Sequence, residues 1–548
     1  MIARRTALSF LSLLVGYSIL GIYAFSLRSN FVFPTEAYWL SFVFVSLPLL
    51  FEVALWRSSQ KLRLLYLFTF SLMINLQYAV VDSSPILSSE DAVADYRLAG
   101  KIIADSEWLP FGSVEWGFGS EYRFYPITDF LYATMSLLTG IPLLIVVKYL
   151  FIVKALVAPP ITQKFFQRFF TQRIAYLATA LFLASPGAIL YPHKESFAVI
   201  FFLLGMYAAT RIEKARQYPL VGFICVTTLI MTHHFTSYIF MGLLSALFIA
   251  SSYYGSRKAA RVSGQFLLLC LSVFASWVAF IAWAIVAAHQ RFVSEVFFET
   301  LLPGRVSFSE VLPLYTAYER AIVWLGLGIT VVSTILGFVG YLRDKRGFSS
   351  SFFAITVFLV PLLFVASVFR FSSRSFNVLI SHRFYEFGYI IVGAFSALFF
   401  TWAFKFRKKL SLRVIVTCVA VVMIVVGPMT GAMHPRTFSK VSKVVSSRAL
   451  SLNTWMNEFS SSNEYTVGDQ VVYIILSIYG ESKATRHTEL LVAQNFSLLQ
   501  EERVEWAYVV THVYMADFYG LNATKFSNSP DFHTLYSNGL LTVYRRGS

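Results

Sequence analysis

The stretch SSEDAVADYRLAGKIIADSEW, from Ser88 to Trp108, places Glu90, Asp91 and Asp95 directly after a long apolar run. From Asp91 onward the pattern recurs in steps of four, three and four up to Ile102, so these positions share one face of a helix. The apolar later turns favour a helix that lies on a membrane surface with its carboxylates at the N-terminal end. Such carboxylates either complement the helix dipole or form a reaction site. The rest of the sequence has to decide between these two interpretations.

Composition indicates a membrane protein. The chain has 548 residues, of which 57% are hydrophobic and 14% charged, with a mean hydropathy of +0.64. A soluble protein carries roughly 25% charged residues. Apolar runs of about 20 residues, long enough to cross a bilayer, recur along most of the chain. These features predict an all-α polytopic membrane protein.

The net charge of +16 does not indicate nucleic-acid binding. Basic residues cluster in short segments between the apolar runs, such as RSSQKLR, GSRKAAR and KFRKKLSLR. Lys and Arg are retained in this way on the cytoplasmic side of membrane proteins. All three cysteines lie inside apolar runs, so they predict neither a disulfide framework nor a Cys-based metal site.

Placing the basic segments inside gives a consistent topology of about 13 helices with a cytoplasmic N-terminus. The segment 126–140 breaks the alternation and is predicted to lie on or dip into the outer leaflet. We divide the chain into two additional N-terminal transmembrane helices (1–62), a catalytic transmembrane region (63–430) with the outer loop 82–126, and an extracytoplasmic domain (431–548). The predicted spans are 7–27, 37–56, 63–81, 141–158, 173–190, 196–211, 218–232, 236–253, 263–288, 318–342, 351–369, 385–403 and 414–430.

The C-terminal part is less apolar and predicts a small mixed α/β domain. NTWMNEF is typical of a helix, whereas EYTVGD, EWAYVVTHV and LLTVYRR are typical of strands. Two glycosylation acceptor triplets, at Asn495 and Asn522, agree with a location outside the membrane.

Charged and histidine residues gather on the predicted outer turns. Basic residues on this side run against the positive-inside bias, so they require a local explanation. An anionic ligand at the outer leaflet supplies one, because the Arg fork fits phosphate oxygens. The alternative for each is an interfacial side chain that reaches water or bonds within its own loop. The residues are His193, Lys194 and Glu195 in YPHKES, His233 and His234 in THHFTSY, and Arg374, His382, Arg383 and Glu386 in SSRSFNVLISHRFYEF.

This arrangement resembles the type C (GT-C) glycosyltransferases, which include the protein O-mannosyltransferases and the lipid A aminoarabinose transferases. In that family the first large outer loop begins with an essential acidic residue, followed by an amphipathic helix and a Pro-led juxtamembrane helix. Asp91, YRLAGKIIADSEW and YRFYPITDFLYATMSLLTG match these features. The C-terminal domain resembles the outer domains of archaeal members. The Trp-Trp-Asp signature of oligosaccharyltransferases is missing, which argues against transfer of a whole oligosaccharide to asparagine.

The resemblance implies transfer of a sugar from a polyprenyl-phosphate donor at the outer face of the cell membrane, to a glycolipid, a glycan or a protein. Asp91 would be the general base, Glu90 its nearest substitute, and Asp95 an acceptor-orienting or metal-binding residue. The leaving phosphate requires cations and hydrogen-bond donors, for which Lys194, Arg374, Arg383, His193 and His382 are the candidates. His233, His234, Glu195 and Glu386 would line the site.

Three points stay open in the sequence. A divalent metal, held by Asp91 or Asp95 with His233 or His234, is compatible with the residue types but not indicated by their spacing. A transporter or lipid-linked-glycan flippase is the first alternative, although such proteins usually keep ionisable groups near the bilayer midplane. A receptor or assembly scaffold that presents the C-terminal domain is the second alternative.

Overall fold

The computed structural model describes most of the helical region and part of the C-terminal domain. The described helical residues are 2–28, 34–56, 58–81, 90–108, 124–185, 194–283, 286, 290, 316–343, 349–372, 381–406 and 410–430. In the C-terminal part they are 447–459, 465–468, 472, 475–476, 484–486, 506–515, 526 and 532–546.

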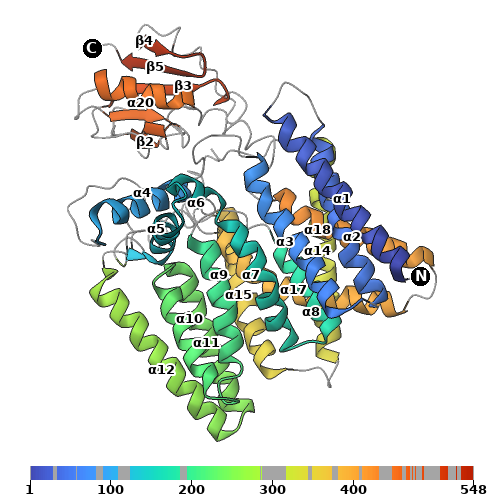
Figure 1. Cartoon of the computed structure of the whole chain (residues 1–548). Helices are drawn as coiled ribbons and strands as arrows, with labels where there is room; N and C mark the ends of the chain where they lie inside the picture. Colours follow the sequence, from blue (N-terminus) through green and yellow to red (C-terminus); the bar gives the residue numbers. More distant parts are fainter. Residues whose placement is uncertain are drawn as a thin grey trace.

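A bundle of long helices makes up most of the molecule (Figure 1). Every range that the sequence predicts as a span contains a helix. Among the described residues, eight helices are long and apolar enough to cross a membrane. The helices are α1 (Ile2–Ser26), α2 (Thr35–Leu55), α3 (Gln60–Val81), α7 (Phe151–Gln167), α8 (Gln172–Leu183), α9 (Lys194–Ala209), α10 (Gln217–Ile230), α11 (His234–Tyr254), α12 (Arg257–Phe280), α14 (Ala317–Arg343), α15 (Ser350–Ser372), α17 (Ser381–Phe406) and α18 (Leu410–Thr430).

Helices distant in sequence pack against one another in this bundle. α14 and α8 both pack on α17, while α9 packs on α10 and α7. One continuous apolar core joins the helices from α1 to α18 and includes Phe42, Phe202 and Phe395. α14 and α17 approach so closely that a Cβ at Gly337 would collide with the Phe395 carbonyl group. Small residues permit such close contacts between membrane helices.

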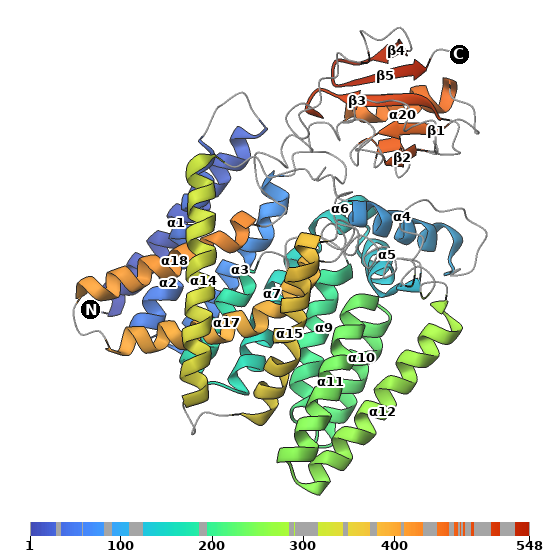
Figure 2. The same ribbon diagram turned by 180° about the vertical axis from the view of Figure 1, so that it is seen from behind.

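Three shorter helices lie together at one end of the bundle, beneath the C-terminal domain (Figures 1 and 2). They are α4 (Glu90–Asp105), α5 (Ile127–Thr139) and α6 (Leu143–Tyr149). α4 confirms the helix predicted from Asp91 onward, and α5 confirms the helix predicted within 126–140. α5 ends at Gly140, whose φ of 68° and N–H bond to the Ser136 carbonyl form a left-handed cap.

A small apolar core holds these three helices to the start of α9. Val93 of α4, Tyr132 of α5, Val147 of α6 and Phe197 of α9 are all buried in it. The ring of Tyr132 meets that of Phe197 edge to face, with 6.1 Å between their centroids. This core fixes the polar side chains that the same helices carry.

The C-terminal domain contains the helix α20 (Ser447–Phe459) and a five-stranded sheet of order β2-β1-β3-β5-β4. The sheet is parallel among β2, β1 and β3 and antiparallel from β3 through β5 to β4. Buried side chains such as Leu452, Val509 and Val543 form a core separate from that of the bundle. The strands are β1 (Tyr465–Gly468), β2 (Ala484–Arg486), β3 (Trp506–His512), β4 (Phe532–Ser537) and β5 (Leu541–Arg546).

Candidate functional site

Two carboxylates and one ammonium group form a buried cluster where α4, α5 and α9 meet. Lys194 Nζ, at the start of α9, donates to Asp129 Oδ2 at 2.6 Å and lies 3.6 Å from Asp95 Oδ1. It also donates to the Tyr125 carbonyl oxygen at 2.7 Å. None of the three charged side chains is more than 1% exposed. Lys194 therefore joins α4, the start of α5 and α9 at a single point.

Burial dominates the electrostatics of this cluster. It raises the pKa of the Asp129 carboxyl group to about 6, although the positive charge of Lys194 and the hydrogen bond that Lys194 donates to Asp129 act in the opposite direction. Burial also raises the pKa of the Tyr132 phenol well above its ordinary value, and the charges of Asp95 and Asp129 add to this rise. Tyr132 therefore lies within electrostatic range of both carboxylates.

The segment before α5 connects the cluster to the turn between α10 and α11. The N–H of Ile127 donates to the Met231 carbonyl oxygen at 3.4 Å. The Tyr125 ring lies 5.2 Å from the His234 ring, and His234 in turn lies 5.0 Å from His233. His234 is thus a neighbour of the residue whose carbonyl group binds Lys194, and His233 lies next to His234.

His233 has a clear structural role. Its side chain caps α11 by accepting from the Thr236 N–H at 3.4 Å, and its Nδ1 lies 2.8 Å from Thr236 Oγ1. Only 2% of its surface is exposed. His234 is half-buried and is packed between the rings of Tyr125, His233 and Tyr238.

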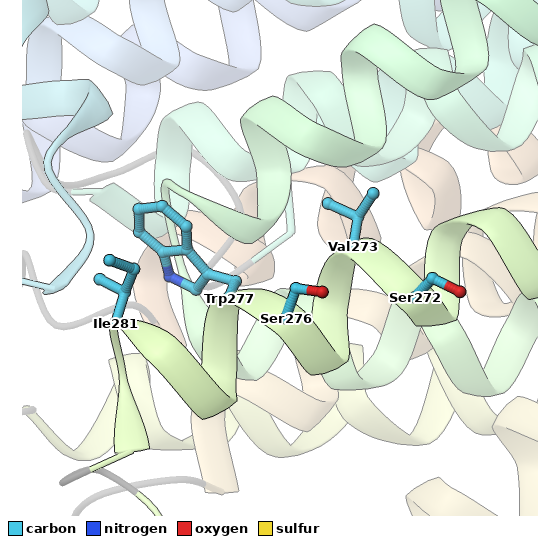
Figure 3. A pocket seen from close by; sticks show the side chains of 5 residues that line it. All are labelled: Ser272, Val273, Ser276, Trp277 and Ile281. Carbon is cyan, nitrogen blue, oxygen red and sulfur yellow. The ribbon is translucent and has the colours of Figure 1, made fainter.

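An apolar surface reaches this site along α12. The ring of Trp277 stacks on that of Trp108, just after α4, with parallel planes and 6.1 Å between centroids. Trp277 and Ile281 also pack against the buried Phe124 and Tyr125. A shallow hollow of about 410 Å³ lies along the same helix. Figure 3 shows the side chains that line it. Its lining residues are Ser272, Val273, Ser276, Trp277 and Ile281.

The other predicted outer-turn residues are only partly described. Glu90 and Asp91 occupy the first turn of α4, and His382 and Arg383 the first turn of α17, but their side chains lie outside the described residues. His193 and Arg374 lie outside them entirely. The functional assignments of these six residues therefore stay predictions.

Two further predicted residues are buried in the helical region. Glu195 follows Lys194 on α9 and is 2% exposed, while Glu386 on α17 is 3% exposed. Glu386 interacts electrostatically with Lys154 of α7, which is itself 1% exposed. The structure thus buries Lys154 inside the bundle.

The metal hypothesis has no support among the described side chains. They contain no group of three or more His, Cys, Asp or Glu residues that could hold a metal ion. Between Asp95 and Asp129 the bridging charge is the ammonium group of Lys194. A site that includes Asp91 stays a prediction, because its side chain is not described.

Sequence reasoning missed Asp129, which makes the shortest contact in the cluster. Its signal was a lone carboxylate in the first turn of an otherwise apolar helix that starts after Pro126. Acidic residues are common at that position because they complement the helix dipole, so the residue attracts no attention by itself. The phosphate-binding assignment of Lys194 also stays a prediction, and its two carboxylate neighbours favour a different role.

The fold has counterparts among solved structures, although neither a protein-family model nor a curated protein matches the sequence. The mycobacterial arabinofuranosyltransferase AftD aligns over 90% of this chain and 42% of its own, with 13% identity and a TM-score of 0.50. ArnT from Cupriavidus metallidurans, bound to undecaprenyl phosphate, aligns over 89% of this chain and 98% of its own, with 10% identity and a TM-score of 0.49. The likeness to AftD shows a shared fold. The chain is thus a polytopic helical membrane protein that shares the fold of AftD and carries a small C-terminal α/β domain.

Proposed function

We propose that the chain is a membrane glycosyltransferase that transfers a sugar from a polyprenyl-phosphate donor to an acceptor at the outer membrane face. The observation that carries this proposal is the buried cluster of Asp95, Lys194 and Asp129 at one end of the bundle. The fold shared with an arabinofuranosyltransferase supports the same reading. Buried ionisable groups are expensive in a membrane protein, and they are usually retained for function.

The cluster would fix the position of the reacting carboxylate. Lys194 holds Asp95 near α5 and α9, and Asp91 lies one helical turn before Asp95 on α4. Residues four apart on a helix lie about 5–6 Å apart between Cβ atoms. Asp91 therefore lies one turn from a residue that an ion pair anchors. This anchoring would keep Asp91 in the fixed position that a general base requires. We assign Lys194 to positioning this helix and not to binding phosphate.

The reaction would be an inverting displacement at the anomeric carbon. Asp91 accepts the proton of the acceptor hydroxyl while the oxygen of that hydroxyl forms a bond to the anomeric carbon. The bond from that carbon to the phosphate oxygen breaks, and the lipid phosphate leaves with the electron pair. Arg374, Arg383, His193 and His382 are the proposed stabilisers of the charge on that phosphate. The apolar hollow on α12, which approaches Tyr125, would receive part of the isoprenoid chain.

The test is sugar transfer in reconstituted vesicles from a panel of radiolabelled polyprenyl-phosphate sugars. The wild type is expected to transfer at least one of them, and Asp91→Asn to lose about 10²–10⁴-fold in rate. Asp105→Asn is the matched control, because Asp105 is an exposed carboxylate at the other end of α4. Equal loss in both variants, or full activity of Asp91→Asn, would reject Asp91 as the base, and Glu90→Gln would be tested next.

One observation favours lipid flipping as a second candidate function. Lys154 and Glu386 place opposite charges, both buried, on two helices that could cross the membrane. Transporters use such intramembrane charges. A flippase would move labelled lipid across the vesicle bilayer without transferring sugar, and Lys154→Met would abolish that movement. Sugar transfer with no lipid movement would exclude this alternative.

A further inference from the structure

Two hydroxyl groups on α5 are buried beside the charged cluster without a described partner. Thr128 is 1% exposed and Tyr132 is fully buried. Neither Thr128 Oγ1 nor the Tyr132 hydroxyl has a hydrogen-bond partner among the residues that the structure describes. The two residues are four positions apart, so they share one face of α5. Asp129 lies between them in the sequence.

Such a pair requires an explanation, because a buried hydroxyl without a partner costs about 1–3 kcal/mol. Other buried phenols also lack a partner in the described part of the chain, among them Tyr38 on α2 and Tyr176 on α8. Neither has a second hydroxyl of this kind one turn away on its own helix. Ser71 and Asn75 on α3 also carry buried polar atoms without a described partner at this spacing, so the pair on α5 is distinguished by the carboxylates next to it.

The charges of the cluster select the chemistry of a ligand. Asp95 and Asp129 supply two carboxyl groups against the single ammonium group of Lys194. A phosphate placed beside Thr128 and Tyr132 would be repelled by this excess of carboxylate. A neutral ligand with hydroxyl groups would not be, because each hydroxyl both donates and accepts hydrogen bonds. Sugars are ligands of this kind.

We propose that Thr128 and Tyr132 form a saccharide-binding subsite, in which their side chains hydrogen-bond to the hydroxyl groups of a sugar. The subsite rests on the proposed function for the source of that sugar. The sugar of the lipid-linked donor and the sugar of a glycan acceptor offer the same chemistry. The phosphate of the donor would lie farther from the carboxylates, toward the predicted cations of the other outer turns.

The test removes each hydroxyl while keeping the side-chain shape, in Tyr132→Phe and Thr128→Val. Removal of a hydroxyl without a partner is neutral or stabilising in the free protein, so both variants should unfold at the wild-type temperature or above it. Tyr38→Phe and Tyr176→Phe are the matched controls, since they remove equally buried phenols from other helices. A loss of binding in the α5 variants alone would therefore not reflect misfolding.

Binding is measured in two arms that separate the sources of the sugar. The first compares the Kd of a polyprenyl-phosphate hexose with that of the same polyprenyl phosphate without sugar. The second measures the Kd of methyl hexosides, which mimic a glycan acceptor. We expect the wild type to bind the sugar-bearing probe of one arm more tightly. In each α5 variant this preference, measured from the Kd values, should fall roughly tenfold.

The arm in which the preference disappears identifies the source of the sugar. The proposal is overturned if the wild type shows no sugar preference in either arm. It is equally overturned if the α5 variants keep that preference, or if the control variants lose it to the same extent. The transfer assay is independent of both arms. A sugar preference that depends on Tyr132, in a protein that transfers no sugar, would refute the proposed function and leave the subsite standing.

Discussion

At the residue scale, Lys194 balances the negative charge of two carboxylates that are buried away from water. Lys194→Met would leave Asp95 and Asp129 buried without their ammonium partner. Removing one member of a buried ion pair destabilises a protein by about 3–5 kcal/mol. We therefore expect the variant to unfold well below the wild-type temperature when both proteins are heated in the same detergent.

The double variant Lys194→Met/Asp129→Asn distinguishes this cause from lost packing. It removes one of the two carboxylate charges as well as the ammonium group, so it should be more stable than Lys194→Met alone. Residues in direct contact show such non-additive effects of about 0.5–3 kcal/mol. A double variant whose loss equals the sum of the two single losses would contradict an ionic role for Lys194.

The same residues mark the limit of prediction from the sequence. The sequence analysis named both Asp95 and Lys194 as candidate site residues, each for a separate role. It did not pair them with each other or with Asp129, because Asp129 and Lys194 are 65 positions apart. A contact over that distance depends on how α5 folds back against α9, which no local pattern encodes.

At the scale of elements, apolar run length and helix periodicity were sufficient for the bundle and for α4 and α5. The strands β1, β3 and β5 and the helix α20 also follow the predicted segments. β2 and β4 were missed. β2 has only three residues, and β4 lies at the edge of the sheet with mostly exposed side chains. β4 does not carry the alternation of buried and exposed residues on which strand prediction depends.

The first turn of α14 provides a prediction at this scale. Glu319 accepts from the N–H and the hydroxyl of Thr316 at 2.8 and 2.9 Å, and from Trp39 Nε1 of α2 at 2.8 Å. Glu319→Ala removes the cap and leaves a buried indole N–H without its acceptor. The losses of a cap and of a charged hydrogen bond together predict a destabilisation of roughly 2–4 kcal/mol.

The neighbouring residue serves as the control in the same unfolding experiment. The Tyr318 hydroxyl donates to Glu36 Oε1 at 2.6 Å and so joins the same two helices at an exposed site. Tyr318→Phe should change stability by less than about 1 kcal/mol, because exposed contacts with charged groups contribute little. If Tyr318→Phe proved as damaging as Glu319→Ala, burial would not be the reason for the strength of the Glu319 contacts.

At the scale of the whole molecule, α4 and the turn between α11 and α12 lie at opposite ends of the bundle (Figures 1 and 2). The turn leads into the exposed Arg257, Lys258 and Arg261, whereas Asp105 is exposed at the end of α4. The positive-inside rule places the basic turn in the cytoplasm. We therefore expect α4 to face outward, where the lipid-linked donor is proposed to bind.

Cysteine labelling in intact cells tests this orientation. Cys225, Cys270 and Cys418 are first replaced by alanine, and either Asp105→Cys or Lys258→Cys is then introduced. A membrane-impermeant maleimide should label Asp105→Cys in intact cells, but Lys258→Cys only after the membrane is opened. Labelling of both in opened membranes shows that each thiol is accessible in the folded protein. The reverse pattern would place α4 and its carboxylates in the cytoplasm, where sugar transfer at the outer face is impossible.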